Sequence, residues 1–358
     1  MKITDIKIEK VRINLTEPFR VAFAEISYSE NILIKVSTDM GIDGYGEAAP
    51  IAFVTGETSD SVVSVLNMLK PGLIGMDPLD IEAIHSLMDG CILGNGSAKC
   101  AVDLAMYDIK GKLMGQPVYK VLGGYSNSVQ NDITIGINAP EKMAAEAKRH
   151  VEEDGFHILK IKAGINVKED VRAMKLIREA VGPDIRLRVD ANQGYDVADA
   201  VYALTEFRQY GIEAVEQCLP HWDFDGSAYI RSKVNGIKVM LDESIHNHID
   251  AARACKYGCA DILNIKLMKC GGLFRASQIN SIAEAYGVTC MVGCMMETKL
   301  ATTAGVSLVA SKKNITEADC DSFLFYEDEQ TGMNGGFTRV NDRFTLLDQP
   351  GFGLDISF

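Results

Sequence analysis

Residues 158–190 read ILKIKAGINVKEDVRAMKLIREAVGPDIRLRVD. The two outer segments, ILKIKA and IRLRVD, are short apolar runs of the kind that form buried strands. Between them, Lys168–Val181 has the amphipathic pattern of a helix. This stretch therefore predicts a strand–helix–strand unit, which is the building block of a parallel sheet.

The same pattern repeats over the following and preceding residues. The predicted strands are ITIGI, ILKIKA, IRLRVD, AVEQ, IKVMLD, ILNIKL, VTCMVG and ITEAD, and further helical patterns cover Glu141–Glu153, Val197–Tyr210 and Leu273–Tyr286. One residue near each strand end lies 24 to 28 residues from the next: Thr134, Lys162, Asp190, Glu216, Asp242, Lys266, Val292 and Asp319. Eight units of such even length favour a (β/α)8 barrel over a doubly wound sheet.

The chain before this repeat has a different pattern. Residues 1–50 are β-like, and helical patterns follow at Ser59–Lys70, Asp80–Met88 and Ser97–Leu113, with Ser97 as the expected N-cap. We therefore predict an α+β capping domain at residues 1–125 and a barrel at 126–320. Residues 321–358 are expected to pack back on the capping domain.

Composition narrows the class of protein. The 358 residues carry 36 basic and 49 acidic side chains, for a net charge of −13, which argues against nucleic acid and against a polybasic membrane contact. The nine cysteines contain no C-x-x-C pair, as expected for a reducing compartment. No signal peptide and no membrane span is evident, so we expect a cytoplasmic protein.

Three carboxylates end successive predicted strands: Asp190, Glu216 and Asp242. In a (β/α)8 barrel these positions converge on the catalytic face. Carboxylates placed so close together repel one another unless a cation holds them, and oxygen ligands favour Mg²⁺ or Mn²⁺. His246 and His248, just beyond Asp242, are interpreted as a surface pair.

Lysines end two further strands. Lys160 and Lys162 are two residues apart, so strand alternation points both into the barrel mouth. Lys266 ends the sixth strand, across the barrel from Lys162, while Lys269 is out of phase with it and is expected to be structural or exposed. Two facing lysines can remove a proton from one face of a substrate and return it to the other.

Together, the segments LKIKAG, RVDANQG, VEQ, LDES, NIKLMKCGG and GYGEAAP resemble the enolase superfamily, and within it the muconate lactonising subgroup. The resemblance covers the whole chain. It implies a capping domain before a modified TIM barrel, (β/α)7β, in which the last helix is missing. The segment CDSFLFYEDEQ after Asp319 indeed lacks a helical pattern.

The resemblance also implies residue roles. Lys162 and Lys266 would be the acid/base pair, and Lys160 would contact the substrate carboxylate and lower the pKa of Lys162. Asp190, Glu216 and Asp242 would bind one Mg²⁺ per subunit. This site serves several reactions in the subgroup, all of which begin with proton abstraction beside a carboxylate.

The eighth strand distinguishes among those reactions. Asp319 and Asp321 form a D-x-D similar to the pair with which dipeptide epimerases hold the substrate ammonium. This implies epimerisation at the Cα of the C-terminal residue, through an enediolate, by two-lysine 1,1-proton transfer. N-acylamino acid racemase, o-succinylbenzoate synthase and muconate-type cycloisomerase remain alternatives. A Schiff-base lysine barrel and a non-catalytic barrel are alternatives of other classes.

Two loops of the capping domain, Phe19–Glu25 and Ile51–Gly56, would cover the substrate. Family members acting on L-Ala-D/L-Glu carry an arginine where Ala24 aligns, so an acidic side chain is disfavoured. The expected apolar pocket includes Phe19, Phe23, Ile51, Phe53 and Val54, with Thr134 and Met296 as further candidate contacts. A hydrophobic dipeptide is therefore the predicted substrate, and by analogy the protein is expected to be a homo-oligomer.

Overall fold

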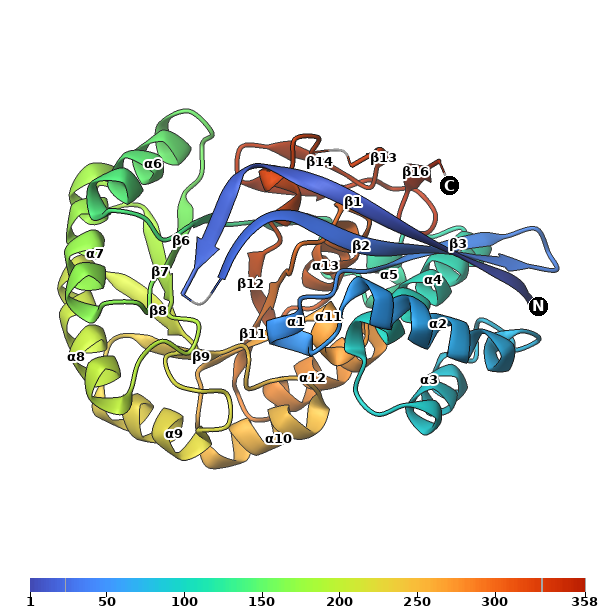
Figure 1. Ribbon diagram of the computed structural model, residues 1–358, viewed down its shortest axis with the longest axis horizontal. Coiled ribbons are helices and arrows are strands. Elements are labelled where there is room, and N and C mark those ends of the chain that lie inside the picture. Colours follow the sequence, from blue (N-terminus) through green and yellow to red (C-terminus); the bar gives the residue numbers. More distant parts are fainter. Residues whose placement is uncertain (23, 330, 358) are drawn as a thin grey trace.

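The computed structural model describes residues 1–22, 24–329 and 331–357. Its centre is an eight-stranded parallel sheet that follows chain order (Figure 1). The strands are β5 (Ile133–Ile135), β6 (Ile158–Lys162), β7 (Arg186–Asp190), β8 (Ile212–Glu216), β9 (Lys238–Leu241), β10 (Ile262–Lys266), β11 (Thr289–Gly293) and β12 (Ile315–Asp319). Each ends within one residue of the position marked for it in the sequence, from Thr134 to Asp319. Asp132 N donates to Ala318 O at 3.2 Å, which brings the first and last strands together.

Helices follow the first seven of these strands and form the outer ring. They are α6 (Pro140–Glu152), α7 (Val167–Val181), α8 (Val197–Phe207), α9 (Phe224–Lys233), α10 (His248–Tyr257), α12 (Leu273–Ala285) and α13 (Lys299–Ser311). Two short elements accompany them, η1 (Arg208–Tyr210) after α8 and α11 (Leu267–Cys270) directly after β10. Within the described residues, β12 is followed only by a 3-10 turn, η2 (Ser322–Phe325). The predicted (β/α)7β barrel is confirmed.

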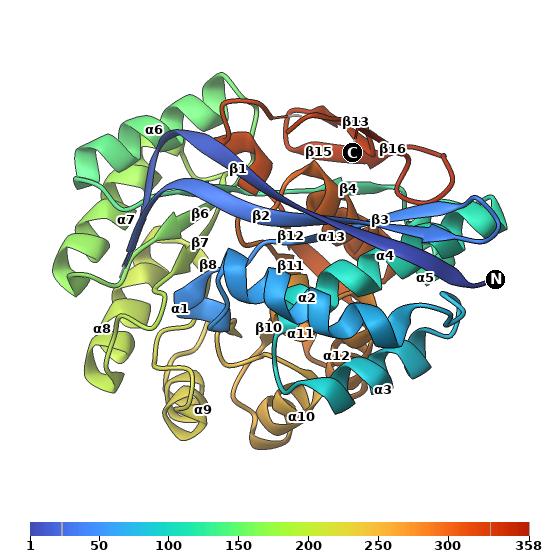
Figure 2. The ribbon, with the colours of Figure 1, turned by 45° about the vertical axis from the view of Figure 1, so that its right-hand side comes forward.

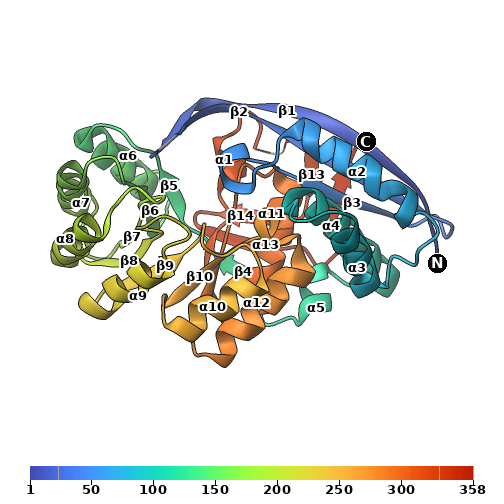
Figure 3. The same ribbon diagram turned by 60° about the horizontal axis from the view of Figure 1, so that its bottom comes forward.

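The N-terminal region lies across the barrel mouth. An antiparallel sheet contains β1 (Ile3–Val21), β2 (Ala24–Thr38) and β3 (Asp43–Ala48), and the helices are α1 (Ala52–Thr55), α2 (Ser59–Leu73), α3 (Ile81–Cys91), α4 (Gly96–Met114) and α5 (Val118–Leu122). The long β1–β2 hairpin arches toward α6 (Figure 2), and α1 lies between the hairpin and the barrel (Figure 3). Ile137 N donates to Arg20 O at 3.0 Å, which ties the hairpin to the barrel just after β5.

The start of α4 corrects one prediction, since Ser97 is not its N-cap. The helix begins at Gly96, and Asn95 occupies the cap with a φ of +55° and no side-chain cap bond. The Glu57 carboxylate instead accepts hydrogen bonds from Ser97 N at 2.9 Å and Ala98 N at 3.1 Å. A residue distant in sequence thus supplies the oxygen that a local cap would have provided.

The C-terminal segment returns to both parts of the chain. It contains β13 (Met333–Gly335), β14 (Phe337–Val340), β15 (Arg343–Leu346) and β16 (Leu354–Ile356), and β15 pairs with β4 (Ser128–Gln130). Tyr326 bridges to Leu15 in β1, and Gly351 bridges to Pro117 beside α5. The domain boundaries at 125 and 320 stay predictions.

Two large hydrophobic cores and one small cluster, formed by Ala214, Met240, Ile262 and Met291, stabilise the described part of the molecule. The first joins residues of the N-terminal region, such as Ile34 and Leu104, to residues of the later barrel, such as Leu263 and Leu300. The second contains residues of β5 to β9 and their helices, including Leu159 and Phe207. All nine cysteines are free thiols. No helix in the described ranges is long and apolar enough to cross a membrane.

Candidate active site at the strand ends

The structure places the three predicted metal ligands at the ends of neighbouring strands, close enough for each carboxylate to affect the pKa of the others. Asp190 ends β7, Glu216 ends β8 and Asp242 follows β9, and all three are buried. Lys160 Nζ lies 2.9 Å from Glu216 Oε2 and 3.3 Å from Asp190 Oδ2. One ammonium group therefore bridges two of the carboxylates at the centre of the barrel mouth.

The two predicted acid/base lysines lie on opposite sides of these carboxylates. Lys162 Nζ is 2.7 Å from Asp190 Oδ2 on one side, and Lys266 Nζ is 2.8 Å from Asp242 Oδ2 on the other. Their strands, β6 and β10, are four apart in an eight-stranded barrel. A small molecule bound between them would have an amine on each face.

Burial and mutual repulsion shift the pKa values of these groups. Burial and the Asp190 carboxylate raise the pKa of Glu216 to about 7. Burial opposes ionisation of Asp190 as well, but the Lys162 and Lys160 ammonium groups lower its pKa to about 2. For Lys266, burial alone would lower the pKa, and the Asp242 carboxylate raises it above its ordinary value. These carboxylates can therefore be ionised together only when positive charge lies among them.

The donor atoms here fit a hard divalent cation. Three buried carboxylates supply oxygen ligands, which Mg²⁺ prefers. Two more buried oxygens nearby, Asn264 Oδ1 and Glu243 Oε2, have no hydrogen-bond partner among the described residues. Asn264 Nδ2 donates to Glu216 Oε1 at 2.6 Å, and thereby orients that carboxylate.

The D-x-D pair lies beside Lys160. Asp319 Oδ2 is 2.7 Å from Lys160 Nζ. Thr134 contacts both acids, because its N donates to Asp321 Oδ2 at 2.7 Å and its Oγ1 to Asp319 Oδ1 at 3.3 Å. Cys294 Sγ lies 3.5 Å from Asp321 Oδ1. Burial and the Asp319 carboxylate raise the pKa of Asp321 to about 6, so a cation would be bound favourably here.

The predicted pocket residues differ in their surroundings. Phe19 packs on Phe325, with ring centroids 5.0 Å apart. Met296 is buried, and its carbonyl oxygen accepts from Asn31 Nδ2 and Tyr326 OH, both at 2.7 Å. Ala24 begins β2 and is half-buried, whereas Phe53, in α1, is 49% exposed. Phe23 lies outside the described residues.

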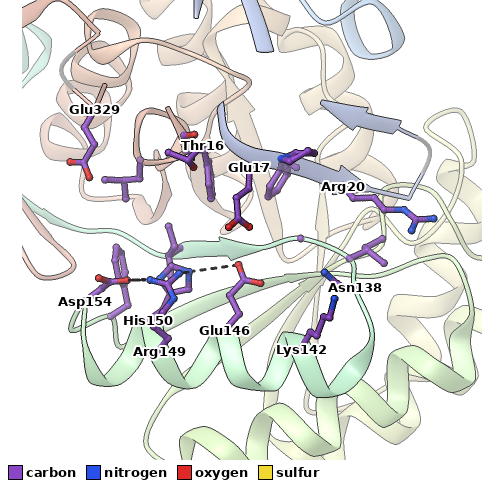
Figure 4. Close-up of a pocket in the computed structure, with 18 of the residues that line it drawn as sticks. Thr16, Glu17, Arg20, Asn138, Lys142, Glu146, Arg149, His150, Asp154 and Glu329 are labelled. Carbon is purple, nitrogen blue, oxygen red and sulfur yellow. Dashed lines mark hydrogen bonds and ion pairs between the residues drawn. The ribbon is translucent and has the colours of Figure 1, made fainter. Parts of the chain in front are cut away.

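A cavity of about 830 Å³ lies beside the barrel mouth (Figure 4). It separates β1 from α6 where the barrel lacks its eighth helix, and its walls include Glu17, Arg20, Glu25, Lys142 and Glu146. None of the strand-end acids and lysines described above lines it. This cleft is therefore distinct from the candidate active site.

Sequence reasoning misjudged some neighbours of the site. Of the two alternatives predicted for Lys269, exposure is wrong, because the side chain is buried with Nζ donating to Asp242 Oδ1 and to Asp242 O. His246 and His248 are half-buried, and His246 Nε2 lies 3.4 Å from Val54 O. Asn264 and Glu243 were not singled out, because an amide and a second acid beside Asp242 give no distinct sequence signal.

Comparison with known proteins accounts for both parts of the chain. Residues 3–123 match the family model described as mandelate racemase / muconate lactonizing enzyme, N-terminal domain. Residues 142–357 match the model described as enolase C-terminal domain-like.

Two relatives at about 40% identity are dipeptide epimerases. The chain is 41% identical to an L-Ala-D/L-Glu epimerase of Clostridium acetobutylicum, over 99% of both chains. It is 42% identical to a hydrophobic dipeptide epimerase of Enterococcus faecalis, over 90% of this chain and 91% of the relative. The crystal structure of the dipeptide epimerase from Enterococcus faecalis V583 with Mg and L-Leu-L-Tyr is 40% identical, with a TM-score of 0.96 over 99% of both chains.

Proposed function

The chain belongs to the mandelate racemase / muconate lactonizing enzyme family of the enolase superfamily, and we propose that it is a Mg²⁺-dependent dipeptide epimerase, an isomerase. The observation that carries this proposal is the placement of Lys162 and Lys266 on opposite sides of three buried carboxylates. The substrate would be bound between the two amines.

Asp190, Glu216 and Asp242 would hold one Mg²⁺ per subunit. When bound, the cation supplies positive charge that stabilises the negative charge developing on the substrate carboxylate. Lys162 removes the α-proton from one face, and Lys266 delivers a proton to the other face. The roles exchange in the reverse direction. Lys160 contacts the substrate carboxylate from its central position between Glu216 and Asp319.

Asp319 and Asp321 would bind the N-terminal ammonium of the dipeptide, with Thr134 holding both carboxylates in place. Muconate, succinylbenzoate and N-acyl amino acids carry no such cation. The buried acid pair therefore favours a dipeptide over the substrates of the other reactions in the subgroup. Inversion would occur at the Cα of the C-terminal residue, whose carboxylate faces the metal ligands.

A hydrophobic side chain is the favoured specificity. Ala24 begins β2 and offers no cation for an acidic side chain, and the candidate contacts Phe53 and Met296 are apolar. Arg20 and Glu25, which would favour charged side chains, line the cleft beside α6 together with Phe19. The Enterococcus faecalis relative bound to L-Leu-L-Tyr agrees with this preference. A cytoplasmic location and a homo-oligomeric state stay predictions.

The decisive experiment follows α-deuterium incorporation from D₂O across a dipeptide library, with Mg²⁺ and with EDTA. Exchange and epimerisation of hydrophobic dipeptides, dependent on Mg²⁺, are expected. Exchange confined to Xaa-Glu or to Xaa-Lys and Xaa-Arg would overturn the hydrophobic preference. Exchange of N-acyl amino acids but of no dipeptide would overturn the dipeptide assignment itself.

A further inference from the structure

Lys269 lies in the site but has no part in the proposed proton transfer. Its side chain has no exposed surface, and Nζ donates to Asp242 Oδ1 and to the carbonyl oxygen of the same residue. The other carboxylate oxygen, Asp242 Oδ2, lies 2.8 Å from Lys266 Nζ. The two oxygens of this carboxylate therefore have different lysine partners.

The short helix α11 places Lys269 there. It begins directly after β10 and ends at Gly271, whose φ is +90° and whose N donates to Leu267 O at 3.0 Å. This helical turn brings the third residue after Lys266 back over the strand ends. Because β9 and β10 are adjacent, Lys269 comes to lie against Asp242.

The N-terminal region packs directly on α11. A Cβ atom at Gly96, the first residue of α4, would lie 2.4 Å from Lys269 O and 2.5 Å from Met268 O. Ala49 N also donates to Met268 Sδ at 3.3 Å. The absence of a side chain at Gly96 permits this close approach, which fixes the backbone of Lys269.

We propose that Lys269 is a positioning residue for the cation site. By holding Oδ1 and the main chain of Asp242, Lys269 would direct Oδ2 toward the cation, on the side where Lys266 lies, and the contact at Gly96 would keep Lys269 in place. Charge-assisted hydrogen bonds to a metal-binding carboxylate set its orientation. The inference rests on the proposed role of Asp242 as a metal ligand.

The test measures Mg²⁺ affinity by isothermal titration calorimetry, without substrate, for wild type, K269M and K269Q. Loss of a residue that hydrogen-bonds to a metal ligand typically weakens metal binding about 10–100-fold, and we expect this for K269M. The Mg²⁺ concentration needed for half-maximal exchange should rise likewise, while the rate at saturating Mg²⁺ falls less, because Lys269 contacts no substrate. K269Q, which retains a donor, should lie between K269M and wild type.

K99M is the matched control. Lys99 is also a buried lysine in the α4 contact region, and it pairs with Asp89 Oδ1 at 2.7 Å and Ile92 O at 2.8 Å. We expect K99M to lower stability without changing Mg²⁺ affinity. In G96A, the added Cβ would press on Lys269 O, so this variant should weaken Mg²⁺ binding as K269M does.

The inference would be overturned if K269M and K269Q both bound Mg²⁺ within twofold of the wild-type affinity. Loss of folding in both variants would also overturn it, because Lys269 would then act in stability alone. A wild type that binds no Mg²⁺ also overturns it. A wild type that binds Mg²⁺ but exchanges no dipeptide overturns the proposed function and leaves this inference standing.

Discussion

Gly293 on β11 has no side chain, and this leaves room for the side chain of Lys266 on β10. The two residues are register partners in neighbouring strands. A Cβ atom at position 293 would lie 3.1 Å from Lys266 Cε and 2.7 Å from Asn264 Oδ1. Any larger residue would displace the lysine or the amide that orients Glu216.

The variant G293A should therefore slow the reaction on one face of the substrate. Exchange from the epimer whose α-proton faces Lys266 is expected to fall more than exchange from the other epimer. Initial rates of deuterium incorporation from the L,L and L,D forms of one dipeptide measure this. G90A, at a helical glycine with nothing within 4 Å of the added Cβ, serves as control. An equal decrease for both epimers would contradict displacement of Lys266 and would indicate displacement of Asn264, which orients Glu216.

Removing either lysine should separate epimerisation from exchange. K162A and K266A are each expected to lose epimerisation by about 10²–10⁴-fold, the usual contribution of a general acid or base. Each variant should retain exchange with only one epimer, because the remaining amine reaches one face. NMR of both epimers in D₂O gives this readout. Retained epimerisation in both variants would exclude the two-base mechanism, and borohydride trapping with a carbonyl substrate would instead reveal a Schiff base.

D321N should discriminate between dipeptides and N-acyl amino acids. Truncating one charge of a buried pair costs about 2–5 kcal/mol, so kcat/KM for a dipeptide should fall at least ~30-fold. An N-acetyl amino acid has no ammonium group, and its residual exchange should change little. The ratio of the two kcat/KM values is the measurement. A parallel loss for both substrates would indicate general damage to the site.

Glu297, beyond the end of β11, should make stability pH-dependent. It is buried with Oε2 unpartnered, and burial together with the Glu47 carboxylate raises its pKa from 4.5 to about 8. The folded protein thus keeps a proton that the unfolded chain releases near pH 4.5. The resulting stabilisation is complete below that pH and is lost as pH rises through 8.

The variant E297Q, which mimics the protonated acid, should remove this dependence. Between pH 5 and 9 the wild type is expected to lose on the order of a few kcal/mol more unfolding free energy than E297Q. Urea unfolding at both pH values provides the comparison. The same loss in the two proteins would mean that Glu297 does not titrate in this range.

The strand ends could be predicted because each unit repeats the same pattern and places its last residue at the catalytic face. Asp190, Glu216 and Lys266 were found in this way, and the structure brings them together. The contact of Lys269 with Asp242 was missed because strand alternation was extended past β10, where the backbone is already helical. Ser97 failed as a cap because Glu57, 40 residues away, accepts its N–H. Such contacts between distant segments leave no local pattern in the sequence.

The boundary between the two hydrophobic cores does not coincide with residue 125. The first core unites the N-terminal region with the later barrel strands, while the second is confined to β5–β9 and their helices. Segments that pack in the same core tend to open to solvent together, even when they are far apart in the chain. The molecule is thus a half-barrel docked on a composite of cap and half-barrel, and amide protons near Ile34 and Leu263 would gain solvent access in the same opening event.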